Sequence, residues 1–247
     1  MKTVIYGVAA ALAALLPTAA GASEIKVLAS NAVGEPYREL IPLFEKASGH
    51  TVIVDWGGTL NIIKRLEGGE VADFVIIGSE HIDRFVKAGL LVSRVDLVRS
   101  GVGAAVRAGA PHPDISSPAA LKQTLLAAKS IVLSSGPSGM YLPSLFERMG
   151  IADALKPKIT QLASGLPVGE AIARGEGEIG FTQTSEFLSI KGIDYLGPLP
   201  GDTQLITVFA AGLHAKAGAP DAARALIQFL KAPEAAPALR HHGMEPG

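Results

Sequence analysis

Small hydroxyl, amide and glycine residues recur where the strands of this sequence are expected to end. They stand in both halves of the chain, at Ser30, Asn31, Gly58, Thr59, Ser79, Ser138, Gly139 and residues 182–185. Each alone is typical of a helix N-cap or a tight turn. Several helix N-termini gathered in one place offer unpaired N–H groups and partial positive charge, which hold a small anion without a buried lysine or arginine. The pattern therefore predicts an anion site in a cleft between two α/β lobes.

Sequence signatures of catalysis are absent. The chain contains no phosphate-binding glycine loop, no His-Glu-x-x-His or Gly-x-Ser-x-Gly motif and no dinucleotide fingerprint. It has no cysteine and its six histidines are scattered, so a thiol nucleophile is excluded and neither a metal nor a cofactor is expected. Carboxylates near strand ends could serve as general bases, but such residues more often cap helices and fix loops. They are Asp55, Asp73, Glu80 and Glu186.

The composition is that of a globular protein. Of the 247 residues, 48% are hydrophobic and 18% are charged, a length and balance that suit one large domain or two of ordinary size. The formal net charge is −1, from 22 basic and 23 acidic residues, and no long run of one sign would follow a phosphate backbone. Nucleic acid is therefore not an expected partner.

The first 22 residues have the organisation of a secretory signal peptide. Lys2 precedes an apolar run from Val4 to Leu16, and Pro17 and small residues ending at Ala22 follow. A membrane-spanning helix is less favoured because it needs about 20 apolar residues, more than this run provides. The segment predicts export to the periplasm with cleavage after Ala22.

Beyond the leader, short β-branched runs alternate with amphipathic stretches. Strands are expected at 25–29, 51–55, 73–77, 131–133, 178–181 and 207–211. Helices are expected at 37–47, 60–66, 82–88, 140–149, 168–174 and 220–230, with Pro42 kinking the first of them or marking its start. The alternation predicts an α/β fold with a mostly parallel sheet flanked by helices. Ligands of such sheets bind at the carboxyl ends of the strands, where the polar residues lie.

A succession of segments resembles the molybdate-binding-protein-like group of periplasmic solute-binding proteins of ABC transporters, the bacterial extracellular solute-binding family 11 type. The segments are Ser30-Asn31 and residues 43–50, 72–77, 102–111, 138–141, 173–180 and 224–230. The similarity covers nearly all of the chain after residue 22, in the same order. It implies a type II-like fold of two lobes joined by a two-strand hinge, which closes on its ligand.

The resemblance also implies how the chain is divided between the lobes. Residues 23–102 and 204–247 would form lobe I, and residues 103–203 would form lobe II. The chain would cross between them near Gly101–Val106 and Gln204–Val208. The expected partners are a small anionic ligand and an ABC transporter permease in the inner membrane, and the expected state is a monomer.

Carried over by the resemblance, the ligand contacts fall on loops of both lobes. They are Ser30 and Gly58-Thr59 in lobe I, and Ser138-Gly139, Gly165-Leu166-Pro167 and Gln183 in lobe II. The strand-end pattern adds Asn31 and Ser79 to the expected ligand-binding residues. Molybdate binders of the group carry a Ser-Ser pair, serines and a tyrosine in three of these loops. This chain has Ser30-Asn31, Gly57-Gly58-Thr59 and Thr182-Gln183-Thr184 there.

These departures favour a larger carboxylated anion over molybdate. Asn31 and Gln183 offer amide donors, and amide or guanidinium groups match planar carboxylates. Arg38, Lys64 and Arg65 lie nearby in sequence, although each is first interpreted as a solvated helix residue.

The leading interpretation of function is an exported receptor, not an enzyme, that captures a small anion, either a molybdate-like oxyanion or an organic carboxylate, for ABC-transporter uptake. The alternative is a periplasmic isomerase of the aconitate isomerase type, since that enzyme resembles the same group. A sensor subunit that reports the closed form to a membrane kinase has the same capture chemistry and is not separated from the receptor by sequence.

Overall fold

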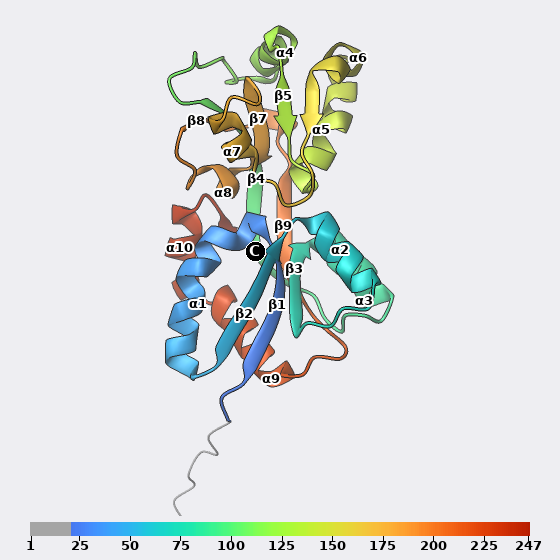
Figure 1. Ribbon diagram of the computed structural model, residues 1–247, viewed down its shortest axis with the longest axis vertical. Helices are drawn as coiled ribbons and strands as arrows, with labels where there is room; N and C mark the ends of the chain where they lie inside the picture. The colour runs from blue at the N-terminus through green and yellow to red at the C-terminus, as the bar shows by residue number, and fades with distance from the viewer. Residues whose placement is uncertain (1–20) are drawn as a thin grey trace, which may run out of the picture.

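The computed structural model describes residues 21–247 and shows two lobes stacked end to end (Figure 1). Nearly all of the predicted signal peptide, residues 1–20, lies outside the described residues, so its identity stays a prediction. Within residues 21–247, no helix has the length and apolar character needed to cross a membrane.

Lobe I is built on three parallel strands that the sequence predicts. Its sheet has the order β2-β1-β3-β9, and hydrophobic clusters cover both of its faces. The strands are β1 (Glu24–Ser30), β2 (Thr51–Gly57) and β3 (Phe74–Gly78). The helices are the 3₁₀ helix η1 (Asn31–Val33), α1 (Gly34–Ser48), α2 (Thr59–Glu67), α3 (Ser79–Lys87), α9 (Pro220–Lys231) and α10 (Ala236–His241).

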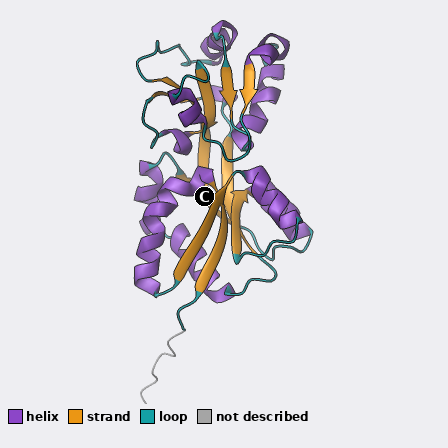
Figure 2. Cartoon of the chain, in the orientation of Figure 1, coloured by secondary structure: helices purple, strands orange, loops and turns teal. Residues whose placement is uncertain are grey.

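Lobe II repeats this plan with its own hydrophobic core. Its parallel strands are β5 (Ile131–Leu133), β6 (Ile159–Gln161) and β7 (Ile179–Gln183), with β5 in the middle. Its helices are α4 (Pro118–Ala127), α5 (Pro137–Arg148), α6 (Ala152–Leu155), α7 (Val168–Ala173) and α8 (Thr184–Phe187). The helices flank the strands on both sides, as Figure 2 shows.

Two antiparallel strands, β4 (Val95–Arg107) and β9 (Ile206–Leu213), run between the lobes. The first half of β4 pairs with β9 in lobe I, and its second half, from Val102, pairs with β7 and with β8 (Ile193–Pro198) in lobe II. The side chain of Gln204 links the two crossings, because Oε1 accepts from the Val102 backbone N at 2.7 Å and Nε2 donates to its O at 3.0 Å. A short C-terminal strand, β10 (Glu245–Pro246), also pairs with β4.

The predicted α/β class, the two lobes and the two-strand hinge are confirmed. Strands that belong to one lobe pair in parallel, and antiparallel pairing enters through the hinge strands β4 and β9 and the short β8 and β10. Pro42 lies inside α1, which begins at Gly34, so it does not mark the start of the helix. The lobe boundaries at 102/103 and 203/204 stay a prediction.

Candidate ligand-binding cleft

A cleft lies between the two lobes, at the carboxyl ends of the parallel strands. It encloses a cavity of about 30 Å³, more than the ~10–15 Å³ that one water molecule needs. Its walls come from β1, η1 and α2 of lobe I and from β5, α5, β7 and α8 of lobe II. The lining residues are Ser30, Asn31, Ala32, Gly58, Thr59, Ser134, Ser135, Gly136, Pro137, Ser138, Gly165, Leu166, Gln183 and Glu186.

The lobe I wall presents two strand ends. Ser30 is the N-cap of η1, and its Oγ accepts from the Ala32 backbone N at 3.3 Å. After β2, Gly58 is the N-cap of α2 in an extended conformation, and within the described chain no side chain caps this helix. Thr59 is 2% exposed, and its Oγ1 has no hydrogen-bond partner among the described residues. Leaving a buried hydroxyl unpaired costs about 1–3 kcal/mol, so Thr59 Oγ1 is a donor in need of an acceptor.

The lobe II wall is formed by the loop from β5 to α5. Ser138 is fully buried, and its Oγ lies 3.0 Å from Ser134 Oγ. Gly136 is the N-cap of α5 and, like Gly58, comes without a side-chain cap among the described residues. Gly139 packs so closely on the loop that a Cβ there would overlap the Ser134 carbonyl. The helix N-terminus is therefore held against the strand end, with its N–H groups directed at the junction.

Direct contacts between the lobes show that the cleft is closed. Asn31 Nδ2 donates to the Gly165 carbonyl at 3.3 Å, and Asn61 Nδ2 donates to the Ser164 carbonyl at 3.3 Å. Both bonds join lobe I to the loop between β6 and α7. A ligand therefore enters the cleft while these contacts are open.

Two further contacts fix how tightly the lobes meet. Ser185 Oγ, at the start of α8, donates to the Ala32 carbonyl at 2.7 Å. Gly58 lies against the loop of lobe II, where a Cβ would overlap Ser164 Oγ and the Gly165 backbone N. Glycine at position 58 thus permits a closure that any other residue would obstruct.

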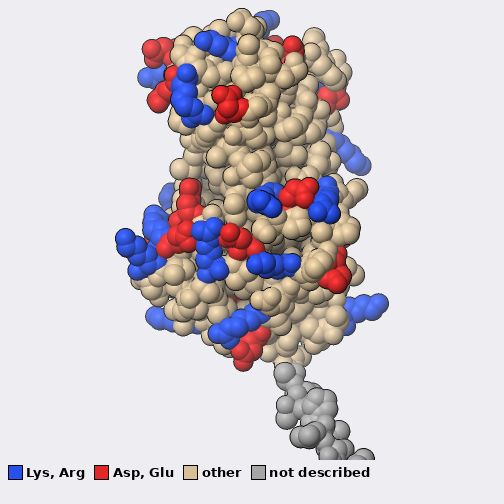
Figure 3. Space-filling model, turned by 180° about the vertical axis from the view of Figure 1, so that it is seen from behind, with Lys and Arg blue, Asp and Glu red and all other residues tan. Residues whose placement is uncertain are grey.

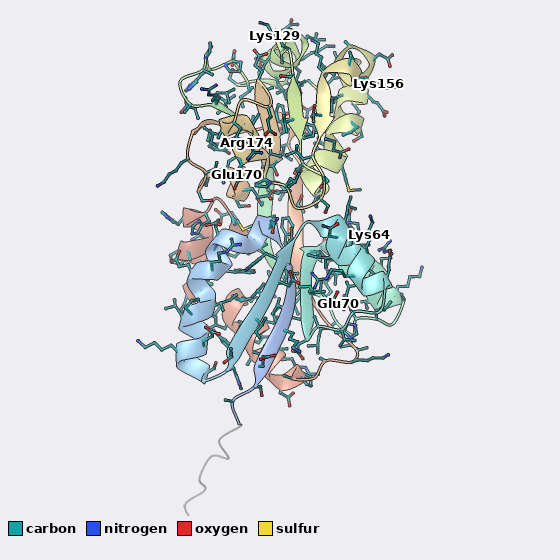
Figure 4. All side chains as sticks on the ribbon, in the orientation of Figure 1. Lys64, Glu70, Lys129, Lys156, Glu170 and Arg174 are labelled. Atoms are coloured by element: carbon teal, nitrogen blue, oxygen red, sulfur yellow. The ribbon has the colours of Figure 1, made fainter. Side chains whose placement is uncertain are left out.

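No lysine or arginine is present among the described residues that line the cleft. Arg38 instead pairs with Glu35 at 2.9 Å and lies over the ring of Trp56 at 4.8 Å. Lys64 lies on α2 near the junction of the lobes, without lining the cavity (Figure 4). Seen from behind in Figure 3, charged side chains gather over the two lobes and leave a mainly uncharged band between them.

Arg65 is also occupied away from the cleft. Its guanidinium pairs with Asp55 at 2.6 Å and with Glu70 at 2.5 Å, and this bonding holds the pKa of the Glu70 carboxyl below its usual value. Lys129 and Lys156 lie at the far end of lobe II (Figure 4). The cleft is therefore suited to holding an anion with hydroxyl, amide and backbone donors.

One acidic side chain, Glu186, is found among the lining residues. Its Oε2 accepts from Thr182 Oγ1 at 2.5 Å, and a backbone hydrogen bond from Gln183 also reaches the carboxyl. Burial nevertheless raises the pKa of Glu186 above its ordinary value, because desolvation outweighs the two hydrogen bonds. The carboxyl is the only titratable group among these lining residues.

The family model described as bacterial extracellular solute-binding protein matches residues 25–245, nearly the whole described chain. The chain belongs to this family. Among curated relatives, an aconitate isomerase from Pseudomonas sp is 38% identical over 230 residues, covering 90% of this chain and 87% of the relative. The molybdate-binding protein ModA of Rhodobacter capsulatus is 28% identical over 238 residues, covering 92% and 90%.

Solved structures of solute-binding proteins share the fold. The periplasmic molybdate-binding protein of Azotobacter vinelandii superposes with a TM-score of 0.73 at 18% identity, over 89% of this chain and 98% of its own. Identity at this level supports the two-lobe architecture and says nothing of the ligand.

Most of the predicted contact residues come together in the cleft of this solute-binding protein. Six of them line the cavity: Ser30, Asn31, Gly58, Thr59, Ser138 and Gln183. Gly139 and Pro167 do not line it; Gly139 packs behind Ser138, and Pro167 is the N-cap of α7 one residue after the lining Leu166. Ligand contact stays a prediction for all eight of these residues.

Two predicted residues have surroundings that the sequence did not indicate. Ser79 lines a neighbouring cavity of about 340 Å³, on the other side of Pro137, which borders both cavities. Gln183 lines the cleft, but its amide is turned to the hinge. Its hydrogen-bond network has the amide nitrogen donating to the Gly101 carbonyl and the amide oxygen accepting from Thr207 Oγ1, at 3.1 and 3.0 Å.

Sequence reasoning left out other residues of the cleft. Ser134 and Ser135 directly follow the predicted strand 131–133, the position that selected the other candidates, so the same signal could have included them. Glu186 is one of the carboxylates that the sequence offers as general bases, although helix capping or loop fixing is the favoured interpretation of its pattern. Its place in the cleft depends on the orientation of a four-residue helix.

Proposed function

We propose that this protein captures a small carboxylate-bearing anion in the interlobe cleft, outside the cytoplasm, and as a monomer delivers it to the permease of an ABC transporter. The observation that carries the proposal is Thr59 Oγ1 at the start of α2, a buried hydroxyl with no partner among residues 21–247. Thr59 and the start of α5 line the same cavity, and the described lining residues include no basic side chain. Such a set of donors matches an anion and leaves an unpaired polar group when the cleft is empty.

The chemistry of the walls favours an organic carboxylate over a tetrahedral oxyanion. Besides the hydroxyls, the cleft offers the Asn31 amide, whose N–H groups donate to carboxylate oxygens, and the Glu186 carboxyl, which donates one hydrogen bond when it is protonated. The relative with 38% identity is named for a tricarboxylate, whereas the molybdate-binding relative has 28%.

Capture proceeds by closure of the lobes. The contacts of Asn31 and Ser185 with the opposite lobe exist only when the lobes meet. An anion that bonds to both walls binds the closed form more tightly and shifts the population toward it. The permease then distinguishes loaded from empty protein by shape.

A binding screen tests this proposal. The protein without its first 22 residues is melted with trans-aconitate, cis-aconitate, citrate, molybdate, tungstate, sulfate or phosphate. A ligand at a hundredfold its Kd adds about 2.7 kcal/mol to the free energy of unfolding and raises Tm by a few degrees. We expect this shift with a tricarboxylate. A shift with molybdate and tungstate alone would contradict the carboxylate, and no shift with any anion would contradict capture.

A second candidate function, isomerisation of the bound acid, is favoured by Glu186. Moving a double bond within a tricarboxylate such as trans-aconitate removes a proton from a methylene carbon and adds one to the carbon at the other end of the allylic unit. One carboxyl can remove and return that proton, and Glu186 is the titratable side chain among the lining residues.

Incubation of the purified protein with trans-aconitate, followed by chromatography, tests the isomerase. Formation of cis-aconitate that disappears in Glu186→Gln and persists in Glu170→Gln would support it. Glu170 is the matched control, since it lies exposed on α7 and pairs with Arg174 at 3.5 Å. Binding of trans-aconitate without formation of cis-aconitate would contradict the isomerase and leave capture as the one supported function.

A further inference from the structure

Glu186 poses an electrostatic problem for an anion site. Within the described chain, the cleft is lined by hydroxyls, an amide and helix N-termini, all suited to negative charge, together with this one carboxyl. An ionised carboxylate in the same small cavity would repel the anion that the other groups attract, in a medium that screens charge poorly. A neutral carboxylic acid would add a donor instead.

Ionisable groups on the elements packed against α8 do not stabilise the charged form of Glu186. These elements are η1, α7, β4, β7 and β8, and the turn at Gly243 lies against Thr184. Their ionisable side chains are Glu170, Asp96, Arg99, Arg107, Asp194, Tyr195, His241 and His242. None of these acts on the carboxyl, whose pKa responds to burial, Thr182 and the Gln183 backbone.

Several of these groups have partners of their own. Asp194 pairs with His112 at 3.0 Å, and Tyr195 OH lies 3.1 Å from Thr184 Oγ1. His242 lies 3.3 Å from Glu39. Within residues 21–247, no lysine, arginine or histidine pairs with Glu186 to neutralise it.

Closure of the lobes is what covers this carboxyl. Ser185, its neighbour in α8, donates to the Ala32 carbonyl of lobe I, so η1 is held over the first turn of α8. Ala32 and Glu186 both line the cavity. When the lobes separate, this cover is removed and water reaches α8, which lowers the cost of ionising Glu186.

We infer that Glu186 takes up a proton when the lobes close on an anion, and that as a neutral acid it donates this proton in a hydrogen bond to the ligand. The inference rests on the proposed capture of an anion and assigns a proton to the same event. The protein would then bind an anion and a proton together, because Glu186, held by Thr182, lines the cavity beside the donors.

The direction of the pH dependence follows from this linkage. Because the closed complex binds one proton more than the free protein, affinity falls as pH rises, by up to about tenfold per pH unit. The fall begins above the pKa of Glu186 in the free, open form and ends above its raised pKa in the complex. An ionised Glu186 would give no such fall.

Calorimetry counts the proton directly. Trans-aconitate is titrated into the protein between pH 7 and 8.5 in Pipes, Hepes and Tris, whose different ionisation heats report proton exchange. We expect proton uptake on binding, which approaches one proton per ligand between the pKa of Glu186 in the free protein and its raised pKa in the complex. Glu186→Gln keeps a neutral donor of the same shape, so it should bind within a few fold of the parent protein, without uptake and without the pH-dependent loss of affinity. Glu170→Gln should retain both.

Infrared difference spectra provide a second measurement. Ligand binding should produce the C=O band of a protonated carboxyl, which is absent in Glu186→Gln. Binding without proton uptake or this band would overturn the inference, leave capture intact and leave an ionised Glu186 available as the base of the isomerase. Loss of binding in a folded Glu186→Gln would overturn it too, since the amide should replace a neutral acid. Absence of binding in the parent protein, to trans-aconitate and the other anions, would instead overturn the proposed function.

Discussion

The two walls of the cleft use similar residues in different ways. On lobe I, the Thr59 hydroxyl has no partner among the described residues. On lobe II, Ser134 and Ser138 are bonded to each other, and the Gln183 amide is bonded to the hinge. Ser164 Oγ of lobe II also has no partner among the described residues, but it lies against Gly58 and does not line the cavity. Among the hydroxyls that line the cavity, the buried one without a partner is therefore on lobe I, and lobe II adds the carboxyl of Glu186. The difference indicates that the cavity lining of lobe II is a fixed platform and that a ligand completes the bonding of lobe I.

Packing supports the same distinction. The tight glycine of lobe II, Gly139, lies against the Ser134 carbonyl of its own lobe, so it determines the fold of that wall. The tight glycine of lobe I, Gly58, lies against Ser164 and Gly165 of the opposite lobe, so it determines closure. Equivalent substitutions in the two walls should therefore affect different measurements.

Gly139→Ala should have the largest effect of the substitutions proposed here, and the quantity affected is the free energy of unfolding. The added Cβ overlaps the Ser134 carbonyl and forces the loop away from α5, at a cost of about 3 kcal/mol in the free energy of unfolding. Gly136→Ala is the matched control, because a Cβ there has Ser134 Oγ as its nearest neighbour at 3.9 Å. It should change stability by less than about 0.5 kcal/mol. Urea denaturation measures the stability of both variants. Equal stabilities of Gly139→Ala and Gly136→Ala would contradict the interpretation of lobe II as a rigid platform.

Gly58→Ala should weaken ligand binding and leave the fold intact. Its Cβ meets the opposite lobe only in the closed form, so an overlap costing 1–3 kcal/mol weakens affinity by about 5- to 150-fold. At Gly57, where a Cβ lies 3.7 Å from Ile62, alanine should bind normally. Calorimetric titration with trans-aconitate, paired with small-angle scattering to follow closure, distinguishes the two. A large loss of stability in Gly58→Ala would contradict its role in closure.

The sequence predicts the strand ends well because their chemistry is local. A buried strand followed by small polar residues and a helix marks Ser30, Thr59 and Ser138, and these three line one cleft. The hinge crossings are also predicted, and the Gln204 side chain joins them as described. Local propensity and the order of the elements suffice for these features.

Other features depend on contacts that no local pattern encodes. Ser79 has the same local signal as Thr59, but Pro137 of lobe II separates it from the cleft. Gln183 points to the hinge because Gly101 and Thr207 lie on strands beside it, a result of register between β4, β7 and β9. Glu186 lines the cleft where α8 meets η1 of the opposite lobe. Side-chain direction and lobe closure are tertiary, so sequence periodicity does not reveal them.

Thr59→Val tests whether the unpaired hydroxyl of lobe I is used by ligand. Valine keeps the shape and removes Oγ1, so affinity for trans-aconitate should fall about tenfold, while the free protein should lose no stability, because the hydroxyl that is removed has no partner among the described residues. Thr203→Val is the contrasting variant, because Thr203 Oγ1 donates to the Pro200 carbonyl at 2.5 Å away from the cleft. Thr203→Val should lose about 1 kcal/mol of stability and bind trans-aconitate with the affinity of the parent protein. Unchanged affinity in Thr59→Val would show that ligand does not use the unpaired hydroxyl of lobe I, and would contradict the distinction between the two walls.

Ser185→Ala should have the smallest effect on ligand affinity. It tests the hydrogen bond between α8 of lobe II and η1 of lobe I. The substitution removes the 2.7 Å bond to the Ala32 carbonyl, which exists only in the closed form. A net loss of about 1 kcal/mol weakens trans-aconitate binding about fivefold. Ser144→Ala, which loses an exposed bond to the Tyr141 carbonyl within α5, should bind as the parent protein does. Because Ser185 holds η1 over Glu186, its loss should also reduce the proton taken up on binding. Weaker binding with unchanged proton uptake would separate closure from the protonation of Glu186.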